Sequence, residues 1–255
     1  MLAEKLKPEH EEPKLYEPVA AILFTIGIYF LSQVVAGLLL SLIPFIQGWD
    51  EAKTNDWLKN SIWATTLYLA FVTATTVWTI SLLLKSRGAT FKNIGLNRPQ
   101  LKYIAYAFNG FVVYFVLYLI GRALIGLLIP AIDVVQDQDI GFQSGTQGAS
   151  LILVFASLAI FPPLAEEIVM RGFLYGGLRT RLTFPVATII TSLIFGAAHL
   201  GGGKESLLWL VAVDTFILSL VMCYLREKTN SLWPPIFLHM IKNTLAFSVL
   251  FIFLH

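Results

Sequence analysis

Two adjacent carboxylates and an arginine stand inside a segment that is otherwise apolar enough to enter a lipid bilayer. They are Glu166, Glu167 and Arg171, in the run Glu-Glu-Ile-Val-Met-Arg. An ionised side chain inside a membrane span costs at least about 2.5 kcal/mol on insertion scales, and such residues usually mark functional sites. The acidic pair is therefore the first candidate for chemistry, and it needs polar partners from other segments.

The spacing gives the two carboxylates different tasks. Neighbouring residues on a helix point about 100° apart, so Glu166 and Glu167 do not face the same cavity. Glu167 and Arg171 are four residues apart in the order that favours an ion pair, and we expect this pair to support the site. Glu166 is then free to act as a base, because an apolar pocket makes a carboxylate more basic. The alternative is that all three residues form a structural polar cluster that holds helices together.

Two later segments supply polar partners. His199 follows Phe195 by four residues, and Asn243 follows His239 by four, so each pair shares one helix face. A histidine can orient or activate water, and an asparagine amide can donate to a developing oxyanion. Together with a carboxylate, these side chains are suited to hydrolysis of an amide bond within the membrane. Serine chemistry is disfavoured, because the sequence has no Gly-x-Ser-x-Gly motif.

A zinc site is the alternative use of these side chains. Two histidines and one carboxylate are the usual protein ligands of a catalytic zinc. Glu166, His199 and His239 come from three separate segments without a His-Glu-x-x-His helix, so their spacing carries no zinc signature. Zinc stays open as a cofactor, and no other cofactor is expected. The single cysteine, Cys223, cannot form an intramolecular disulfide.

Composition sets the fold class. Of the 255 residues, 56% are apolar and only 13% are charged, against about 25% charged in ordinary soluble domains. We predict an all-α, polytopic transmembrane helical bundle of about seven spans around a polar intramembrane cavity. At about 20 residues per span, the spans lie near residues 19–46, 61–84, 103–129, 149–178, 184–200, 206–225 and 232–254.

Two of the predicted spans are irregular. The fourth contains Pro162-Pro163, which predicts a kink. The fifth is short and ends at His199, so we expect it to be sunk into the bundle, with residues 201–204 forming a turn at membrane depth. Whether these two segments cross the bilayer completely stays open.

The charges of the connections predict the orientation. Residues 85–102 carry five basic side chains and no acidic one, whereas residues 131–148 carry three aspartates and no basic side chain. The positive-inside rule places the first connection in the cytoplasm and the second outside. The N-terminal tail is then cytoplasmic, and the site is reached from the cytoplasmic side. No dense basic patch indicates a nucleic-acid partner.

Three motifs together resemble one family. The run EEIVMRGFLYGGLR from Glu166 resembles the Glu-Glu-x-x-x-Arg motif of CPBP intramembrane proteases, which include CAAX prenyl endopeptidases and bacteriocin-processing or bacteriocin-immunity (ABI) proteins. FGAAH at 195–199 resembles its Phe-x-x-x-His motif. TNSLWPPIFLHMIKN at 229–243 is similar to its Ser-Leu-Trp-Pro turn followed by His-x-x-x-Asn. The likeness covers about 149–250, and before it only the apolar character and an Ile-Gly-Leu in the basic loop match.

The resemblance implies a role for each matching residue. Glu166 would be the general base that activates water, assisted by His199, while His239 and Asn243 would stabilise the oxyanion. Glu167 and Arg171 would order the site, and Phe195 would pack against the helix of His199. The chain then divides into a cytoplasmic tail (1–18), accessory transmembrane helices (19–148) and catalytic core helices (149–255) of one membrane domain.

The expected activity follows from the same resemblance. It implies a CAAX-type intramembrane protease, glutamate-dependent or metal-dependent, in a bacterial plasma membrane. The substrate would be a membrane-associated peptide or a lipidated, CAAX-like protein. The alternative is a non-catalytic immunity or scaffold protein that binds a peptide or partner in the same cavity. A proton-coupled transporter is disfavoured, because the sequence lacks paired interrupted helices in two related halves.

Three charged residues stand outside the three motifs. Asp214 lies where the sixth span should carry a small or apolar residue, and we expect it to be a polar partner of the site or a hydrogen-bonding group between helices. Lys242 is expected to reach lipid headgroups, with a substrate carboxylate as the alternative partner. Arg122 is expected to extend to the outer interface.

Overall fold

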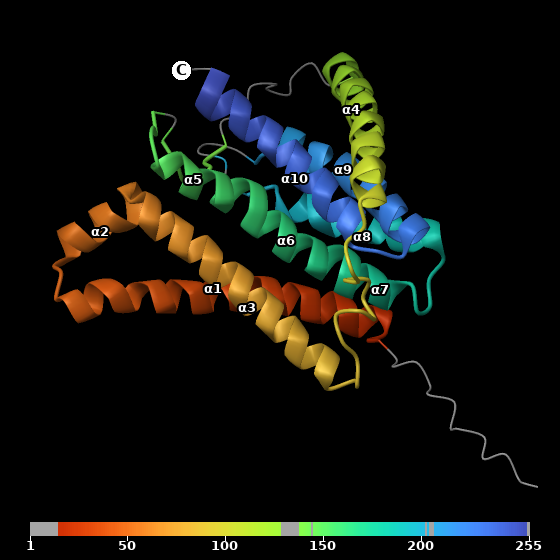
Figure 1. Ribbon diagram of the computed structural model, residues 1–255, viewed down its shortest axis with the longest axis horizontal. Coiled ribbons are helices and arrows are strands. Elements are labelled where there is room, and N and C mark those ends of the chain that lie inside the picture. The colour runs from red at the N-terminus through yellow and green to blue at the C-terminus, as the bar shows by residue number, and fades with distance from the viewer. Residues whose placement is uncertain (1–14, 129–137, 144, 202, 204–206, 254–255) are drawn as a thin grey trace, which may run out of the picture.

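The computed structural model describes residues 15–128, 138–143, 145–201, 203 and 207–253 (Figure 1). Within these residues the chain is helical, and the only β-type pairing is an isolated bridge between Gln138 and Gly203. The predicted all-α class is confirmed. The predicted N-terminal tail falls largely outside the described residues, as do Gly202 and Lys204 of the expected turn after His199.

Six helical runs of the described chain are long and apolar enough to cross a membrane. They are α1 (Pro18–Gln47), α3 (Ile62–Lys85), α4 (Lys102–Leu128), the run Ser150–Leu178, α9 (Trp209–Thr229) and the run Trp233–Phe253, which begins as α10 (Trp233–Ser248) and ends as a π-helix (Val249–Phe253). A shorter apolar helix, α8 (Phe184–Ala198), is the expected fifth segment. The seven predicted segments are therefore present, and one of them is shorter than a full span.

The run Ser150–Leu178 carries the acidic pair and is repeatedly distorted. It consists of α5 (Ser150–Phe155), a π-helix (Ala156–Ile160), α6 (Phe161–Glu167), a second π-helix (Ile168–Leu174) and α7 (Tyr175–Leu178). The two prolines therefore stand at the start of α6, directly after the first π-helical turn, and the expected kink stays a prediction. In Figure 1 this run lies between α1 and α3 on one side and α8 to α10 on the other. Its two carboxylates are thus placed in the middle of the bundle.

Helix α8 packs closely against α9. At Gly196, an added Cβ would lie 2.8 Å from the carbonyl oxygen of Ala212. The missing side chain lets the two backbones approach, as small residues commonly do between membrane helices. Phe195, the neighbour of Gly196, is almost completely buried. Helix α8 is therefore held to the bundle by one face, while Val186, Ile189 and Leu193 on its other face are about half exposed. That the segment is sunk to membrane depth stays a prediction.

Several connections meet at one end of the bundle. Arg181, after α7, forms an ion pair of 2.7 Å with Glu17 at the start of α1. The backbone N–H of Leu232, before α10, donates to Gly95 O in the loop after α3 at 2.9 Å. The basic connections therefore gather at one end, as alternating crossings require. That this end is cytoplasmic stays a prediction.

One helix was not predicted. Helix α2 (Glu51–Asn60) lies between α1 and α3 and begins where the Asp50 side chain accepts a hydrogen bond from Lys53 N at 2.8 Å. Asp50 is therefore its N-cap.

Candidate active site

Glu167 is the central member of a buried chain of three polar side chains, Arg171–Glu167–His239. Its Oε1 accepts a hydrogen bond from Arg171 Nη1 at 3.0 Å and lies 2.9 Å from His239 Nδ1. The side chains of Glu167 and Arg171 are completely buried, and that of His239 is nearly so. The ion pair expected from the spacing is present. Its third member, His239, comes from α10.

The contact with Glu167 determines which imidazole nitrogen is available for chemistry. An ionised carboxylate only accepts hydrogen bonds, so opposite ionised Glu167 the Nδ1–H of His239 is the donor. The other nitrogen, Nε2, lies 3.9 Å from Glu166 Oε2. Nε2 accepts a hydrogen bond when the ring is neutral and donates one when the ring is protonated. Glu167 thus orients His239 with Nε2 towards Glu166.

Glu166 points in a different direction from the same helical turn, about 100° from Glu167. Its side chain is about one-third exposed, and among the described residues its buried Oε2 has no hydrogen-bond partner. This agrees with the helical geometry, in which neighbouring residues point in different directions. Glu166 is therefore the carboxylate that is not paired with Arg171.

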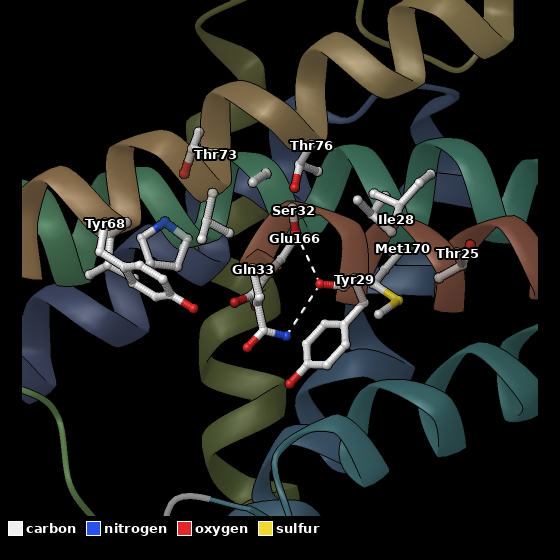
Figure 2. A pocket seen from close by; sticks show the side chains of 15 residues that line it. Thr25, Ile28, Tyr29, Ser32, Gln33, Tyr68, Thr73, Thr76, Glu166 and Met170 are labelled. Carbon is white, nitrogen blue, oxygen red and sulfur yellow. Dashed lines mark hydrogen bonds between the residues drawn. The ribbon is translucent and has the colours of Figure 1, made fainter. Parts of the chain in front are cut away.

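A cavity of about 210 Å³ adjoins Glu166, between α1, α3 and the helical turns around the acidic pair. Figure 2 shows side chains of α1 and α3 around this carboxylate. The lining is largely apolar, with several hydroxyl groups and one amide, from Thr25, Tyr29, Ser32, Gln33, Tyr68, Thr73 and Thr76. Such a surface suits a peptide, because it offers hydrogen bonds to a backbone and contacts to apolar side chains.

Phe195 connects His199 to the buried chain. Its ring lies 4.7 Å from the His199 ring and 6.0 Å from the His239 ring, and the Arg171 guanidinium lies 4.4 Å from its centroid. These contacts are those of a packing residue. His199 Nδ1 lies 2.8 Å from Phe195 O, and within the described chain His199 forms no ion pair with Glu166. Its predicted assistance to the base stays a prediction.

Asn243 contacts the backbone of the distorted run Ser150–Leu178, called the broken run below. Its Nδ2 donates to Leu158 O at 2.9 Å. This bond crosses from α10 to the π-helical turn that precedes Pro162-Pro163. The predicted oxyanion role of Asn243 stays untested by this contact.

No group of three or more His, Cys, Asp or Glu in the described part of the chain is arranged to hold a metal ion. His239 Nδ1 contacts Glu167, and the ring of His199 packs against that of Phe195. The donor set of the described residues therefore gives no support to the zinc alternative.

Asp214 and Lys242 form a second polar cluster, which the sequence did not specify. Asp214 Oδ2 lies 3.3 Å from Lys242 Nζ, and Tyr114 donates its hydroxyl to Asp214 Oδ1. Asp214 is thus a hydrogen-bonding group between α4, α9 and α10. The expectation that Lys242 reaches headgroups is wrong, because an intramembrane carboxylate pairs with it. Arg122 donates to Tyr118, one turn earlier on its own helix, at 3.2 Å.

The loop after α3 is fastened to the turn before α10. Asn97 Oδ1 accepts from Ser231 at 2.9 Å, and Asn97 O accepts from the Trp233 indole at 2.6 Å. Arg226 donates to Ile94 O at 3.2 Å. The Ile-Gly-Leu likeness to the family indicated this loop. Its hydrogen-bond partners could not be predicted from local spacing, because they lie more than 130 residues away in the sequence.

The resemblance to a known family was tested by comparison with known proteins. Residues 148–245 match the family model described as type II CAAX prenyl endopeptidase Rce1-like. The chain is 27% identical over 247 residues to the membrane-embedded CAAX protease MroQ of Staphylococcus aureus, covering 91% of this chain and 88% of MroQ. The resemblance to CAAX-type membrane proteases is confirmed. The matched region contains the acidic pair, both histidines and Asn243.

Two shorter matches cover the same proportion of this chain. The putative membrane peptidase YdiL of Bacillus subtilis is 34% identical over 98 residues, which are 38% of this chain and 36% of YdiL. An uncharacterized 24.3 kDa protein of Escherichia coli is also 34% identical over 98 residues, or 43% of its length. This chain therefore aligns with less than half of either relative. No solved structure matches.

Proposed function

We propose that this protein is an intramembrane endopeptidase in which Glu166 activates a water molecule. The observation that carries the proposal is the buried chain Arg171–Glu167–His239, which turns His239 Nε2 towards the uncommitted Glu166, 3.9 Å away. The family match and the protease names of the relatives support the same reaction class. The carboxylate also borders a largely apolar cavity whose lining includes hydroxyl groups and one amide.

The reaction follows from the two carboxylates. Glu166 takes a proton from water, and the water oxygen forms a bond to the scissile carbonyl carbon. In its protonated form, His239 donates Nε2–H to the oxyanion, while Glu167 stabilises the imidazolium through Nδ1. The proton held by Glu166 then passes to the leaving amine as the carbon–nitrogen bond breaks. Arg171 holds Glu167 in place throughout by means of its ion pair.

The substrate proposed is a membrane-associated peptide or a lipidated, CAAX-like protein. A lipid anchor delivers such a chain to the bilayer, where the cavity between α1 and α3 lies. The hydroxyl groups of Ser32, Thr73 and Thr76 line this cavity beside Glu166. We place the protein in a bacterial plasma membrane with the site reached from the cytoplasm, which agrees with the basic connections at one end.

The test compares the membrane peptidomes of matched cells that express the wild-type protein, Glu166→Gln or Glu51→Gln. Glu51 is an exposed carboxylate at the start of α2, so its variant is the matched control. Uncleaved precursors should accumulate with Glu166→Gln and not with Glu51→Gln. Zinc bound to the same purified proteins is measured alongside, which tests metal dependence separately.

The non-catalytic alternative makes the opposite prediction. An immunity or scaffold protein that binds a peptide in this cavity would leave all three peptidomes alike. If they match while the biological effect of the protein persists in Glu166→Gln, hydrolysis is excluded and the cavity is a binding site.

A further inference from the structure

One backbone carbonyl in the broken run Ser150–Leu178 lacks its ordinary donor. In an α-helix, Leu158 O would accept from the N–H of residue 162, and in a π-helix from that of residue 163. Both positions are proline, which has no N–H. The helix is distorted nearby, where Ile160 has a φ of −119°. Within a bilayer, a carbonyl freed in this way must be satisfied by a neighbouring group.

Asn243 supplies the missing donor. Its Nδ2 lies 2.9 Å from Leu158 O, and because a carbonyl only accepts, the amide must present its nitrogen there. One turn earlier on α10, His239 contacts Glu167 at 2.9 Å. Helix α10 therefore holds the broken run on both sides of Pro162-Pro163 and Glu166.

We propose that Asn243 is a positioning residue whose amide replaces the donor that the prolines lack, and so fixes the turn that carries Glu166. This inference rests on the proposed function, since it concerns the placement of the proposed base. It assigns to Asn243 a different task from the oxyanion contact implied by the family motif. One of the two amide hydrogens is committed to Leu158, which makes the asparagine a link between α10 and the broken run.

The proposal is tested by restoring a backbone N–H, through replacement of a proline by alanine. Phe161 N bonds to Ala156 O, five residues earlier, and in the same register residue 163 faces Leu158 O. Asn243→Ala should lower kcat about tenfold or more, because the freed carbonyl lets the turn shift. Asn243→Ala/Pro163→Ala should recover most of that loss. Asn243→Ala/Pro162→Ala is the comparison, since residue 162 is the donor in the α-helical register.

The measurements are kcat on a farnesylated peptide with a C-a-a-X end and the thermal unfolding midpoint of each purified variant. Recovery of kcat by either proline replacement supports the proposal. If both double variants regain the unfolding midpoint but keep the low kcat of Asn243→Ala, the proposal is overturned and the amide acts on the oxyanion.

Failure of the proposed function gives a different result. If the wild-type protein cleaves neither this peptide nor any cellular precursor, the protease proposal fails. The unfolding midpoints then decide the inference alone. A midpoint lowered by Asn243→Ala and restored by Pro163→Ala supports the hydrogen-bond replacement, and a midpoint that neither proline variant restores overturns it.

Discussion

Glu166 and Glu167 are adjacent in the chain but have opposite surroundings. Glu167 Oε1 is shared by a guanidinium and an imidazole in a fully buried position. Glu166 has a partly exposed side chain, borders a cavity and forms no hydrogen bond through its buried oxygen within the described chain. Neutralising the two residues should therefore have different effects on stability.

The expected contrast can be measured with two isosteric variants. Glu166→Gln should lower kcat by about 10²–10⁴-fold with little change in unfolding, since the proposed base is lost while the Glu167–Arg171 ion pair stays intact. Glu167→Gln should also destabilise the fold, by about 3–5 kcal/mol, because Arg171 is left buried without a compensating charge. Peptidase assays and denaturant unfolding of both proteins test this. Equal unfolding free energies would contradict the assignment of Glu167 to a structural ion pair.

Sequence reasoning recovered the local part of this site. The pair Glu167–Arg171 and the separate direction of Glu166 follow from helical periodicity over four residues. The bond from His239 to Glu167 does not, because 72 residues separate the partners and their approach depends on how α10 packs. The pairing of Lys242 with Asp214 was missed for the same reason. Both contacts are set by tertiary packing, which periodicity does not encode.

At the scale of elements, the close packing of α8 on α9 should control the position of Phe195 and His199. An added Cβ at Gly196 would lie 2.8 Å from the backbone oxygen of Ala212. A backbone atom cannot relieve the clash by a change of rotamer, as a side chain can. Gly196→Ala should therefore destabilise the protein by about 1–3 kcal/mol and lower kcat, because α8 must shift. Gly27→Ala on α1 is the control, since nothing lies within 4 Å of its added Cβ.

Thermal unfolding and peptide cleavage of these two variants test the predicted loss of stability and of kcat. A Gly196→Ala protein as stable and as active as Gly27→Ala would show that α8 has room to move without disturbing Phe195.

The cluster of Tyr114, Asp214 and Lys242 should hold α4, α9 and α10 together through one intramembrane ion pair. Asp214→Ala leaves Lys242 without its carboxylate and should destabilise the protein by about 3–5 kcal/mol. Asp214→Ala/Lys242→Met removes both charges and should recover much of that loss. The unfolding free energies of the single and double variants are compared. Equal destabilisation in the two would mean that the lysine is not charged and paired in this position.

The boundaries of the elements were predictable where hydropathy and span length decide them. The predicted segment 19–46 is α1 (Pro18–Gln47), and 184–200 contains α8 (Phe184–Ala198). Helix α2 and the π-helical turns were not predicted. A capped polar helix of 10 residues gives no membrane signal, and the register of a π-helix depends on side chains from other helices, such as Asn243 on Leu158 O.

At the scale of the whole molecule, the basic loop after α3 binds to the turn between α9 and α10. Its Gly95 accepts from Leu232 N, and Arg226 donates to Ile94 O beside it and to Asn230 Oδ1 at 2.8 Å. The turn fastened in this way leads directly into α10, which carries His239. Disturbing the loop should therefore alter a site that it does not touch.

Two glycines of this loop allow that coupling to be measured. Gly88 and Gly95 both have positive φ values, of 67° and 95°, so an alanine at either position carries backbone strain. Only at Gly95 would the added Cβ meet the Arg226 guanidinium, at 2.8 Å, whereas nothing lies within 4 Å at Gly88. Gly95→Ala should therefore displace Arg226 from its two acceptors and destabilise the protein by about 1–3 kcal/mol beyond the loss in Gly88→Ala. Since α10 starts at this turn, kcat should also fall more in Gly95→Ala than in Gly88→Ala. Similar kcat and unfolding values for the two variants would show that the loop does not position α10.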